Sequence, residues 1–173
     1  MKRLIIDMDD VITDTTGQLI DFYHKAFGVR VTRESLSHQN EGVGFPANHE
    51  AIQRFPHQVD FFRSMIPQIN SIQILEELNK KYDLYIVSAA VQFPQSMAEK
   101  VEWLGEHCSF LTWKQMVFCG SKAVVHGDFM IDDMHYNLET FNGEKFLFTA
   151  PHNLQYSQFQ RLNNWDEVGA RFL

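Results

Sequence analysis

The sequence predicts an α/β protein with a parallel sheet flanked by helices and a small helical cap inserted after the first strand. Short apolar runs rich in β-branched and aromatic residues alternate with longer segments of helical periodicity. Such alternation is typical of parallel sheets built from strand–helix–strand units. The interval from 28 to 68 contains no clear strand of the main sheet. We therefore expect a core formed by residues 1–14 and 69–173, and a cap formed by residues 15–68.

Length, composition and charge narrow the class of protein. A chain of 173 residues with 45% hydrophobic and 21% charged residues suits one globular domain with a small insert. The net charge of −7 argues against a nucleic-acid polymer or a membrane as the main partner, because both attract positive surfaces. Neither a membrane-spanning stretch nor a signal-peptide pattern occurs, so we expect a cytoplasmic protein. The oligomeric state stays open, a homodimer included.

The first strand is expected over 4–6 and runs into an acidic cluster, Asp7, Asp9 and Asp10. In an open parallel sheet, ligands bind in the crevice beyond the carboxyl ends of the strands. Asp7 and Asp9 are two residues apart, so in extended chain they face the same way. Two carboxylates this close repel each other unless a cation joins them or one keeps its proton. The pattern predicts a metal ion, a shared proton, or both.

The cap is expected to begin with a helix. Asp14, Thr15 and Thr16 are suitable N-cap residues, and the apolar residues over 19–27 have helical spacing that stops at Gly28. The remaining cap segments are a loop rich in Gly, Asn and Pro over 40–46 and two short helices over 49–55 and 58–65, separated by Pro56.

After the cap, strands and helices alternate again. A helix begins at Asn70, with Gln73 placed like the third residue of a capping box. Strands are expected over 82–88, 116–120, 128–133 and 144–149, with helices over 94–107 and within 153–173. Polar side chains follow three of these strands, namely Ser88, Lys122 and the pair Asp132 and Asp133. Each alone is more often a turn former, a cap or a surface charge, but their ordered occurrence is hard to explain as turns.

This ordered set resembles the four motifs of the haloacid dehalogenase (HAD) superfamily of phosphatases. The matching residues are Asp7-Met8-Asp9-Asp10-Val11, Ser88, Lys122 and Asp132-Asp133. Within the superfamily the sequence is most similar to the 5′(3′)-deoxyribonucleotidases and their bacterial relatives. Further similar segments, such as Phe148-Thr149-Ala150-Pro151-His152-Asn153, extend the likeness over nearly the whole chain. The resemblance implies a Rossmann-like HAD fold with a helical cap.

The resemblance also implies roles for the first two acids. Asp7 would be the nucleophile that attacks phosphorus and forms an aspartyl-phosphate. Asp9 would donate a proton to the leaving alkoxide and then accept one from the hydrolytic water. The dehalogenases of the superfamily lack an acid at this second position, so Asp9 favours phosphoester hydrolysis.

Magnesium is the cofactor that the resemblance implies. Its ligands would be the Asp7 side chain, the Asp9 backbone carbonyl and a carboxylate from Asp132 or Asp133. We favour Asp132 as the direct ligand with Asp133 behind it, and the reverse order stays open. The ion would offset the charge of the carboxylates and the phosphate, which otherwise repel each other.

The phosphate would be bound by Ser88, by Lys122, and by the backbone amides that follow Asp9 and Ser88, which belong to Asp10 and Ala89. Asp10 stands where the animal enzymes commonly have glycine, and Ala89 where they have a hydroxyl residue.

Substrate choice would depend on the cap. Phe45 stands at a position that resembles an aromatic base contact of the deoxyribonucleotidases, although a place in the cap core is about as frequent for such a residue. Thr15 occupies the position of another aromatic of the animal enzymes and is assigned to the substrate. His152 follows a strand that should end near the same edge, and we assign it no catalytic role.

We therefore expect a magnesium-dependent enzyme that removes phosphate from nucleoside monophosphates, with deoxyribonucleotides favoured. Two alternatives stay open: a phosphatase of another small metabolite, such as a sugar phosphate, and a catalytically silent binding protein with the same fold. The presence of Asp7, Asp9 and Lys122 argues against the silent protein.

Overall fold

The computed structural model describes residues 1–37, 44–46 and 49–173. Its six strands form one parallel sheet in the order β3-β2-β1-β4-β5-β6. The strands are β1 (Arg3–Ile6), β2 (Asp83–Ser88), β3 (Met116–Phe118), β4 (Phe129–Asp132), β5 (Glu144–Phe148) and β6 (Gln160–Leu162). The predicted strands are confirmed, and β6 is an additional edge strand. Because β1 lies between β2 and β4, the residues that follow β1 enter the middle of the crevice.

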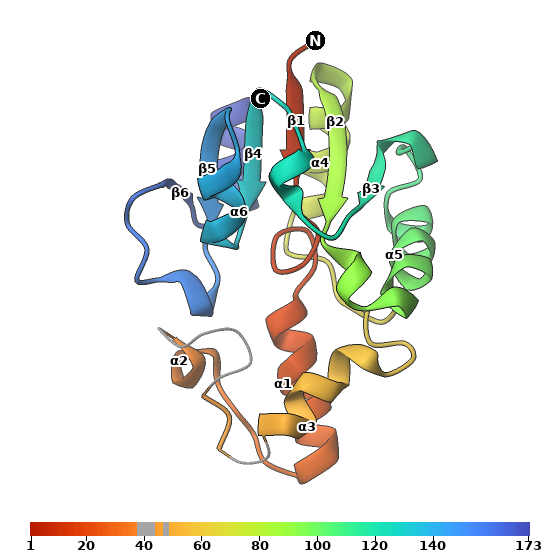
Figure 1. Ribbon diagram of the computed structural model, residues 1–173, viewed down its shortest axis with the longest axis vertical. Helices are drawn as coiled ribbons and strands as arrows, with labels where there is room; N and C mark the ends of the chain where they lie inside the picture. The colour runs from red at the N-terminus through yellow and green to blue at the C-terminus, as the bar shows by residue number, and fades with distance from the viewer. Residues whose placement is uncertain (38–43, 47–48) are drawn as a thin grey trace.

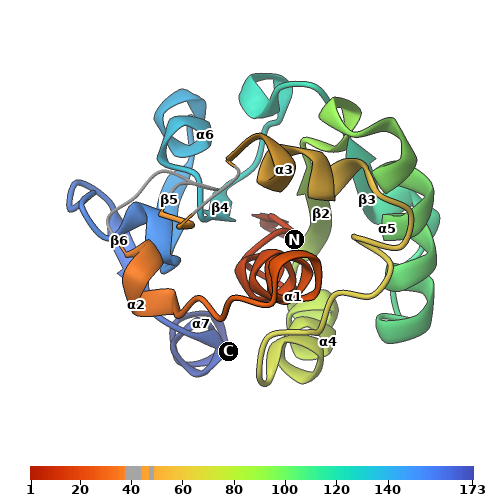
Figure 2. The same cartoon turned by 90° about the horizontal axis from the view of Figure 1, so that it is seen from below.

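Helices cover both faces of the sheet (Figures 1 and 2). They are α1 (Thr15–Phe27), α2 (Arg33–Leu36), α3 (His49–Arg54), α4 (Ser71–Lys81), α5 (Pro94–His107), α6 (His135–Thr140) and α7 (Trp165–Phe172). Single 3-10 turns also occur at η1 (Phe55–His57), η2 (Ala90–Gln92), η3 (Trp113–Gln115), η4 (Lys122–Val124) and η5 (Pro151–Asn153). No helix in the described ranges is long and apolar enough to cross a membrane.

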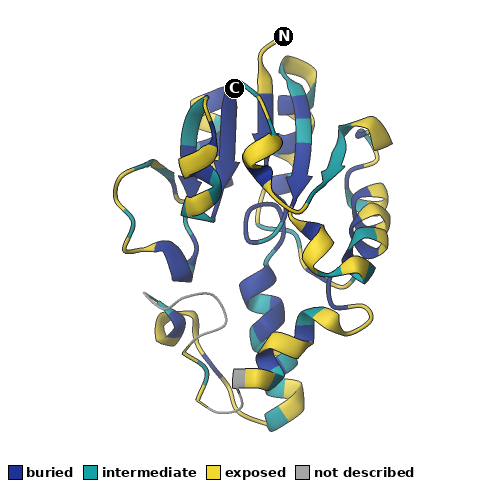
Figure 3. Ribbon diagram, in the orientation of Figure 1, coloured by how far each residue is buried: buried dark blue, intermediate teal, exposed yellow. Residues whose placement is uncertain are grey.

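The strand residues alternate between two apolar cores. Leu4 and Ile6 pack in the larger core with residues of α4, α5 and α7, whereas Ile5 packs in a smaller core with Leu138 of α6. Figure 3 shows most of β1, β2 and β4 and the loop that follows β1 as buried, whereas the edge strand β3 is intermediate. At about 25 cal/mol per Å² of apolar surface, this two-sided burial is the main stabilisation of the sheet.

The chain turns tightly between β1 and α1. The carbonyl of Met8 accepts hydrogen bonds from the backbone nitrogens of Ile12 (2.9 Å) and Thr13 (3.0 Å). Asp10 has a φ of 53°, a conformation that favours glycine but that Asp tolerates. Its carboxylate accepts 2.7 Å hydrogen bonds from the backbone nitrogen and the hydroxyl of Thr16. This geometry gives a reason for the aspartate at a position where the animal enzymes commonly have glycine.

The helices α1, α2 and α3 lie beyond the carboxyl ends of the strands (Figure 1). The predicted end of α1 is confirmed, because Gly28 has a φ of 68° and its nitrogen bonds to the carbonyl of His24. All three helices fall within the predicted cap of residues 15–68, whose boundaries stay a prediction. Residues 40–43 of the predicted loop lie outside the described residues.

The predicted helix over 58–65 is wrong. Residues 59–64 form turns, and Asp60 has a φ of 68°, which interrupts a helix. The Glu99 carboxylate, on α5, accepts hydrogen bonds from the backbone nitrogens of Asp60, Phe62 and Arg63. These donors are therefore satisfied by a side chain distant in sequence, which no local pattern could predict.

The predicted capping box at the start of α4 is also wrong. Asn70 has a φ of 64° and makes no side-chain cap to the helix. Its amide instead donates to Asp166, at the start of α7, at 2.8 Å. The residue ties two helices together rather than capping one.

Candidate active site

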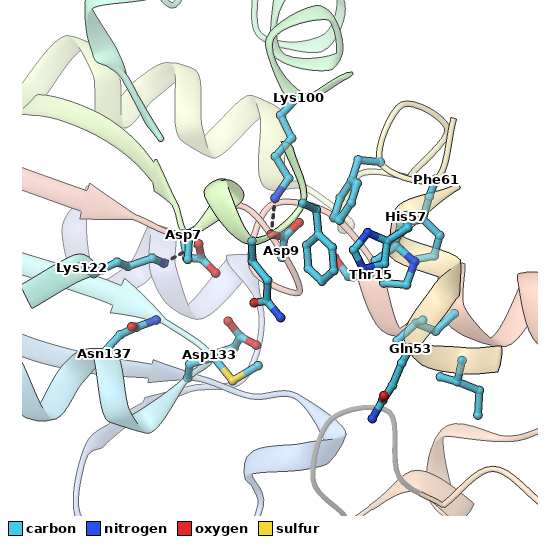
Figure 4. A pocket seen from close by; sticks show the side chains of 18 of the residues that line it. Asp7, Asp9, Thr15, Gln53, His57, Phe61, Lys100, Lys122, Asp133 and Asn137 are labelled. Carbon is cyan, nitrogen blue, oxygen red and sulfur yellow. Dashed lines mark hydrogen bonds and ion pairs between the residues drawn. The ribbon is translucent and has the colours of Figure 1, made fainter. Parts of the chain in front are cut away.

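A pocket of about 490 Å³ opens at the carboxyl ends of β1, β2 and β4. Its charged lining residues, which gather at one end, are Asp7, Asp9, Lys100, Lys122 and Asp133 (Figure 4). Toward the cap, the described lining includes Ile52, Gln53, His57, Phe61, Phe62 and Phe93. The pocket therefore has a charged end on the core and a largely uncharged end on the cap, which suits a ligand with an anionic group and a less polar remainder.

Lys122 links the first and last of the predicted acidic motifs. Its Nζ donates to Asp7 Oδ1 at 2.5 Å and to Asp132 Oδ2 at 2.6 Å, and only 2% of the residue is exposed. Burial alone would lower the pKa of Lys122, but the two carboxylates more than offset this effect and raise it. Lys122 is therefore a permanent positive charge beside Asp7.

Asp7 still lies in a surplus of negative charge. Burial raises the pKa of Asp7 well above its ordinary value, the Lys122 ammonium opposes the rise, and Asp132 and Asp133 reinforce it. A carboxylate that must be ionised to act as a nucleophile thus needs more positive charge than one lysine supplies.

The surroundings of Asp7 fit a magnesium ion. Carboxylate oxygens of Asp7, Asp132 and Asp133 lie within 4.8 Å of one another, and all three residues are buried. Magnesium prefers oxygen ligands and is held by one or two carboxylates together with water and phosphate. These residues would hold the ion, and its charge would oppose both the burial and the repulsion by neighbouring carboxylates that raise the pKa of Asp7.

The two acids of the last motif differ in their surroundings. Asp132 Oδ2 accepts from Lys122, Oδ1 accepts from the nitrogen of Met134 at 2.9 Å, and Asn137 donates to both oxygens. Asp133, and not Asp132, lines the pocket. The geometry therefore favours Asp133 as the direct ligand and Asp132 as its support, the reverse of the order favoured from the sequence.

Asp9 has a lysine of its own. Lys100 Nζ donates to Asp9 Oδ2 at 2.5 Å and to Ser88 Oγ at 2.8 Å, and Ser88 Oγ donates to the same Asp9 oxygen at 3.3 Å. Lys100 was missed in the sequence because it lies inside α5 and not at the end of a strand. The available signal was its spacing from Trp103 and Leu104, which puts a charge on the apolar face of a helix.

The predicted phosphate-binding residues divide into two groups. Lys122 and Ala89 line the pocket, whereas Ser88 is fully buried and is not part of the lining. Asp10 does not reach the pocket either, and its backbone nitrogen donates to Thr15 Oγ at 3.1 Å. The structure therefore does not present the Asp10 amide to a phosphate.

The two predicted substrate-binding residues also separate. Thr15 lines the pocket. Phe45 is not in the lining and packs on Tyr23, with ring centroids 4.9 Å apart. The structure thus places Phe45 with the packing residues of the cap, and its contact with substrate stays a prediction.

His152 and Asn153 hold Asp133 from two sides. His152 Nε2 lies 2.9 Å from Asp133 Oδ2, and Asn153 Nδ2 donates to the Asp133 backbone carbonyl at 2.8 Å. Both residues are buried. His152, to which the sequence assigned no catalytic role, therefore contacts the acid that is best placed to bind a metal.

The match to a family model decides the family. The model of the "5′ nucleotidase, deoxy (Pyrimidine), cytosolic type C protein" family, NT5C, matches residues 2–172. The chain belongs to the NT5C family. It is a phosphomonoester hydrolase, and the resemblance to the 5′(3′)-deoxyribonucleotidases inferred from its motifs is confirmed.

Relatives of this NT5C protein match over nearly their full length. A 5′(3′)-deoxyribonucleotidase of Bacillus subtilis (strain 168) is 33% identical over 174 residues, which covers 100% of both chains. A protein of Staphylococcus aureus (strain Mu50 / ATCC 700699), which carries the same name provisionally, is 36% identical over 172 residues, covering 99% of this chain and 96% of its own.

Solved structures agree on the fold. The HAD hydrolase YfnB of Bacillus subtilis, crystallised bound to magnesium, has a TM-score of 0.62 at 12% identity and covers 99% of this chain and 98% of its own. The L-2-haloacid dehalogenase PA0810 has a TM-score of 0.57 at 12% identity, with 100% of both chains covered. At such identities the likeness establishes the Rossmann-like HAD fold alone.

Proposed function

We propose that this protein is a magnesium-dependent nucleotidase that removes phosphate from nucleoside monophosphates, with deoxyribonucleotides preferred, through an aspartyl-phosphate on Asp7. One observation carries the proposal. Asp7 and Asp9 lie at the charged end of one pocket but have different surroundings, Asp7 beside Lys122 and Asp132, and Asp9 beside Lys100 and Ser88. Two carboxylates in different environments suit two different roles.

Asp7 is the proposed nucleophile. It lies at the end of β1, and its Oδ1 is held by Lys122 at 2.5 Å. The attacking oxygen forms a bond to phosphorus as the bond to the leaving oxygen breaks. Lys122 stabilises the negative charge on Asp7 before the attack and on the phosphoryl group during it.

Asp9 is the proposed acid and base. Its side chain lines the pocket two residues beyond the nucleophile. It gives a proton to the leaving alkoxide in the first step, and it takes one from the attacking water when the aspartyl-phosphate is hydrolysed.

Magnesium is the proposed cofactor, bound by Asp7 and Asp133 and by the backbone carbonyl of Asp9. When bound, it supplies positive charge to the phosphate oxygens and to the nucleophile. The donor set supports this proposal, because carboxylate oxygens of Asp7, Asp132 and Asp133 gather within 4.8 Å. A magnesium-bound solved structure of the same fold is consistent with it.

A nucleoside is the proposed remainder of the substrate. The end of the pocket toward the cap contains Phe62 and Phe93, and the His57 ring lies 4.9 Å from that of Phe93. Aromatic walls favour a flat nucleobase over the hydroxyl-rich surface of a sugar. The names of the bacterial relatives support the same substrate class. The cytoplasmic location and the oligomeric state expected from the sequence stay predictions.

A panel of phosphomonoesters tests the proposed function. Purified protein would be assayed with ribo- and deoxyribonucleoside 5′- and 3′-monophosphates, several sugar phosphates and 4-nitrophenyl phosphate, each with magnesium and with EDTA. We expect hydrolysis of deoxyribonucleoside monophosphates that requires magnesium and depends on the base. Equal activity on sugar phosphates would favour the alternative metabolite phosphatase. Hydrolysis of no substrate would favour the silent binding protein.

A further inference from the structure

We infer that Lys100 is a positioning residue for Asp9. Together with Ser88, it fixes one oxygen of the Asp9 carboxylate and so holds the carboxyl group in the orientation in which it exchanges a proton with the leaving group and with water. This inference rests on the proposed function. It adds to the reaction a residue of α5 that no strand-end motif contains.

The Lys100 side chain is fixed by two hydrogen bonds and by a contact with an aromatic ring. Only 1% of the residue is exposed, and its Nζ donates to Asp9 Oδ2 (2.5 Å) and to Ser88 Oγ (2.8 Å). The same ammonium lies 4.4 Å from the centre of the Phe62 ring, a favourable cation–π distance. A buried lysine with two hydrogen bonds and an aromatic face beneath it has little freedom to move.

The two oxygens of Asp9 have different surroundings. Oδ2 accepts hydrogen bonds from Lys100 and Ser88. Oδ1 is buried and has no hydrogen-bond partner among the described residues. Among the described residues, the contacts that fix the Asp9 carboxylate are therefore those of Lys100 and Ser88 on Oδ2. Because Asp9 lines the pocket, these two contacts set how its carboxyl group is oriented toward a substrate.

The proposed chemistry uses the Asp9 carboxyl group twice. In the first step its proton moves to the leaving alkoxide while the phosphoryl group moves from the leaving oxygen to Asp7. In the second step the Asp9 carboxylate takes a proton from the water that attacks phosphorus, the bond between phosphorus and Asp7 breaks, and protonated Asp9 is restored. Lys100 keeps its proton in both steps. It acts by holding the carboxyl group in the orientation that proton transfer requires.

A direct role of Lys100 on the phosphate is the competing explanation, because Lys100 also lines the pocket. The two roles differ in their dependence on the leaving group. A residue that binds phosphate acts equally on every phosphomonoester. A residue that acts through Asp9 matters for an alkoxide, which needs a proton to leave, and little for 4-nitrophenolate, which does not.

The test compares kcat/KM for thymidine 5′-monophosphate and 4-nitrophenyl phosphate in the wild type and in Lys100→Met. The ratio kcat/KM reports the first phosphoryl transfer and is not affected by the later hydrolysis of the aspartyl-phosphate. We expect Lys100→Met to lose about 100-fold on the nucleotide and less than about 5-fold on 4-nitrophenyl phosphate. Equal losses on both substrates, or no loss on the nucleotide, would overturn the inference.

Four further variants make the result specific. Asp9→Asn should show the same selectivity between substrates, and adding Lys100→Met to it should cause little further loss on the nucleotide, because the two residues act as a unit. Lys80→Met, which removes an exposed lysine paired with Glu77, should leave both substrates unaffected. Lys100→Gln keeps a neutral donor and should lie between the wild type and Lys100→Met. If Lys100→Met does not fold, Lys100→Gln takes its place in the comparison of kcat/KM on the two substrates.

The wild-type measurements separate the inference from the proposed function. A wild type that hydrolyses both substrates, with equal losses in Lys100→Met, would refute the role of Lys100 alone. A wild type that hydrolyses neither substrate would refute the proposed function, and the inference with it.

Discussion

Two buried lysines hold the two aspartates that follow β1, and they do so in different ways. Lys122 lies in a 3-10 turn after β3 and bonds to two carboxylates, those of Asp7 and Asp132. Lys100 lies inside α5 and bonds to one carboxylate, that of Asp9, and to a hydroxyl. The Lys122 side of the pocket therefore carries surplus negative charge, whereas the Lys100 side is balanced.

This difference shows where a cation belongs. Burial raises the pKa of Asp7, and the surplus negative charge of its neighbours Asp132 and Asp133 adds to the rise. A divalent ion placed there compensates this charge. The one-to-one pair of Asp9 and Lys100 leaves no surplus negative charge, so that side of the pocket needs no cation. The predictions below test this division, from the largest effect to the smallest.

Asp7→Asn should abolish turnover, because an amide oxygen is a poor nucleophile for phosphorus. We expect a loss of at least about 10⁴-fold in kcat on every substrate, comparable with the removal of other enzymatic nucleophiles. Steady-state kinetics of the purified variant provide the measurement. Circular dichroism must show an unchanged fold, since the substitution is nearly isosteric. Substantial remaining activity would remove Asp7 from the role of nucleophile.

Lys122→Met should slow the reaction irrespective of the leaving group. The loss of a positive charge beside the nucleophile and the phosphoryl group should cost about 10²- to 10³-fold in kcat/KM. Thymidine 5′-monophosphate and 4-nitrophenyl phosphate should be affected alike, in contrast to Lys100→Met. A selective loss on the nucleotide would mean that the two lysines do not have separate roles.

His152→Ala should weaken magnesium binding. Without the imidazole 2.9 Å from Asp133 Oδ2, the carboxylate is less firmly oriented, and the magnesium Kd should rise about 10-fold. Isothermal titration calorimetry of the substrate-free protein measures this directly. His126→Ala, at an exposed position, is the matched control and should bind magnesium as the wild type does. An unchanged Kd in His152→Ala would show that the contact does not support the ion.

The smallest effect concerns stability without metal. The pKa of Asp7 in the folded protein lies above its unfolded value, so its stabilising contribution is present below the unfolded pKa and is lost as the pH rises through the folded pKa. Asp7→Asn should therefore unfold at a higher temperature than the wild type in EDTA at pH 7, by about 2–4 °C for each kcal/mol of relieved repulsion. The difference in Tm between Asp7→Asn and the wild type should become smaller as the pH is lowered toward 4. A lower Tm for the variant at pH 7 would contradict this.

The sequence predicted the Lys122 side of the site better than the Lys100 side, for a physical reason. Residues that follow parallel strands meet at one edge of the sheet, so Asp7, Lys122 and the pair Asp132 and Asp133 could be expected there from the predicted topology and the family resemblance. Lys100 reaches Asp9 only because α5 packs at a particular angle and depth. That packing depends on side chains from many elements, which a local pattern does not contain.

The order of Asp132 and Asp133 and the place of Phe45 could not be predicted for related reasons. Which of two adjacent acids faces the pocket depends on how the chain turns after β4, and Asn137 and Lys122 engage Asp132 there. Phe45 is aromatic in either role, and its packing on Tyr23 follows from the tertiary placement of the cap. By contrast, α1 and the central strands could be predicted from the local sequence, because the helical periodicity of the one and the apolar runs of the others are strong signals.

The proposed aspartyl-phosphate can be tested directly by trapping it. The protein would be mixed with thymidine 5′-monophosphate and magnesium, quenched within the first turnover, and treated with borohydride, which reduces an acyl phosphate to an alcohol. Mass spectrometry of the peptide that contains residues 4–12 should find homoserine at position 7 and unmodified aspartate at positions 9 and 10, with no reduction in the absence of substrate. Homoserine at position 9, or none in an enzyme that turns over under the same conditions, would contradict the assignment of Asp7 as nucleophile and Asp9 as acid and base.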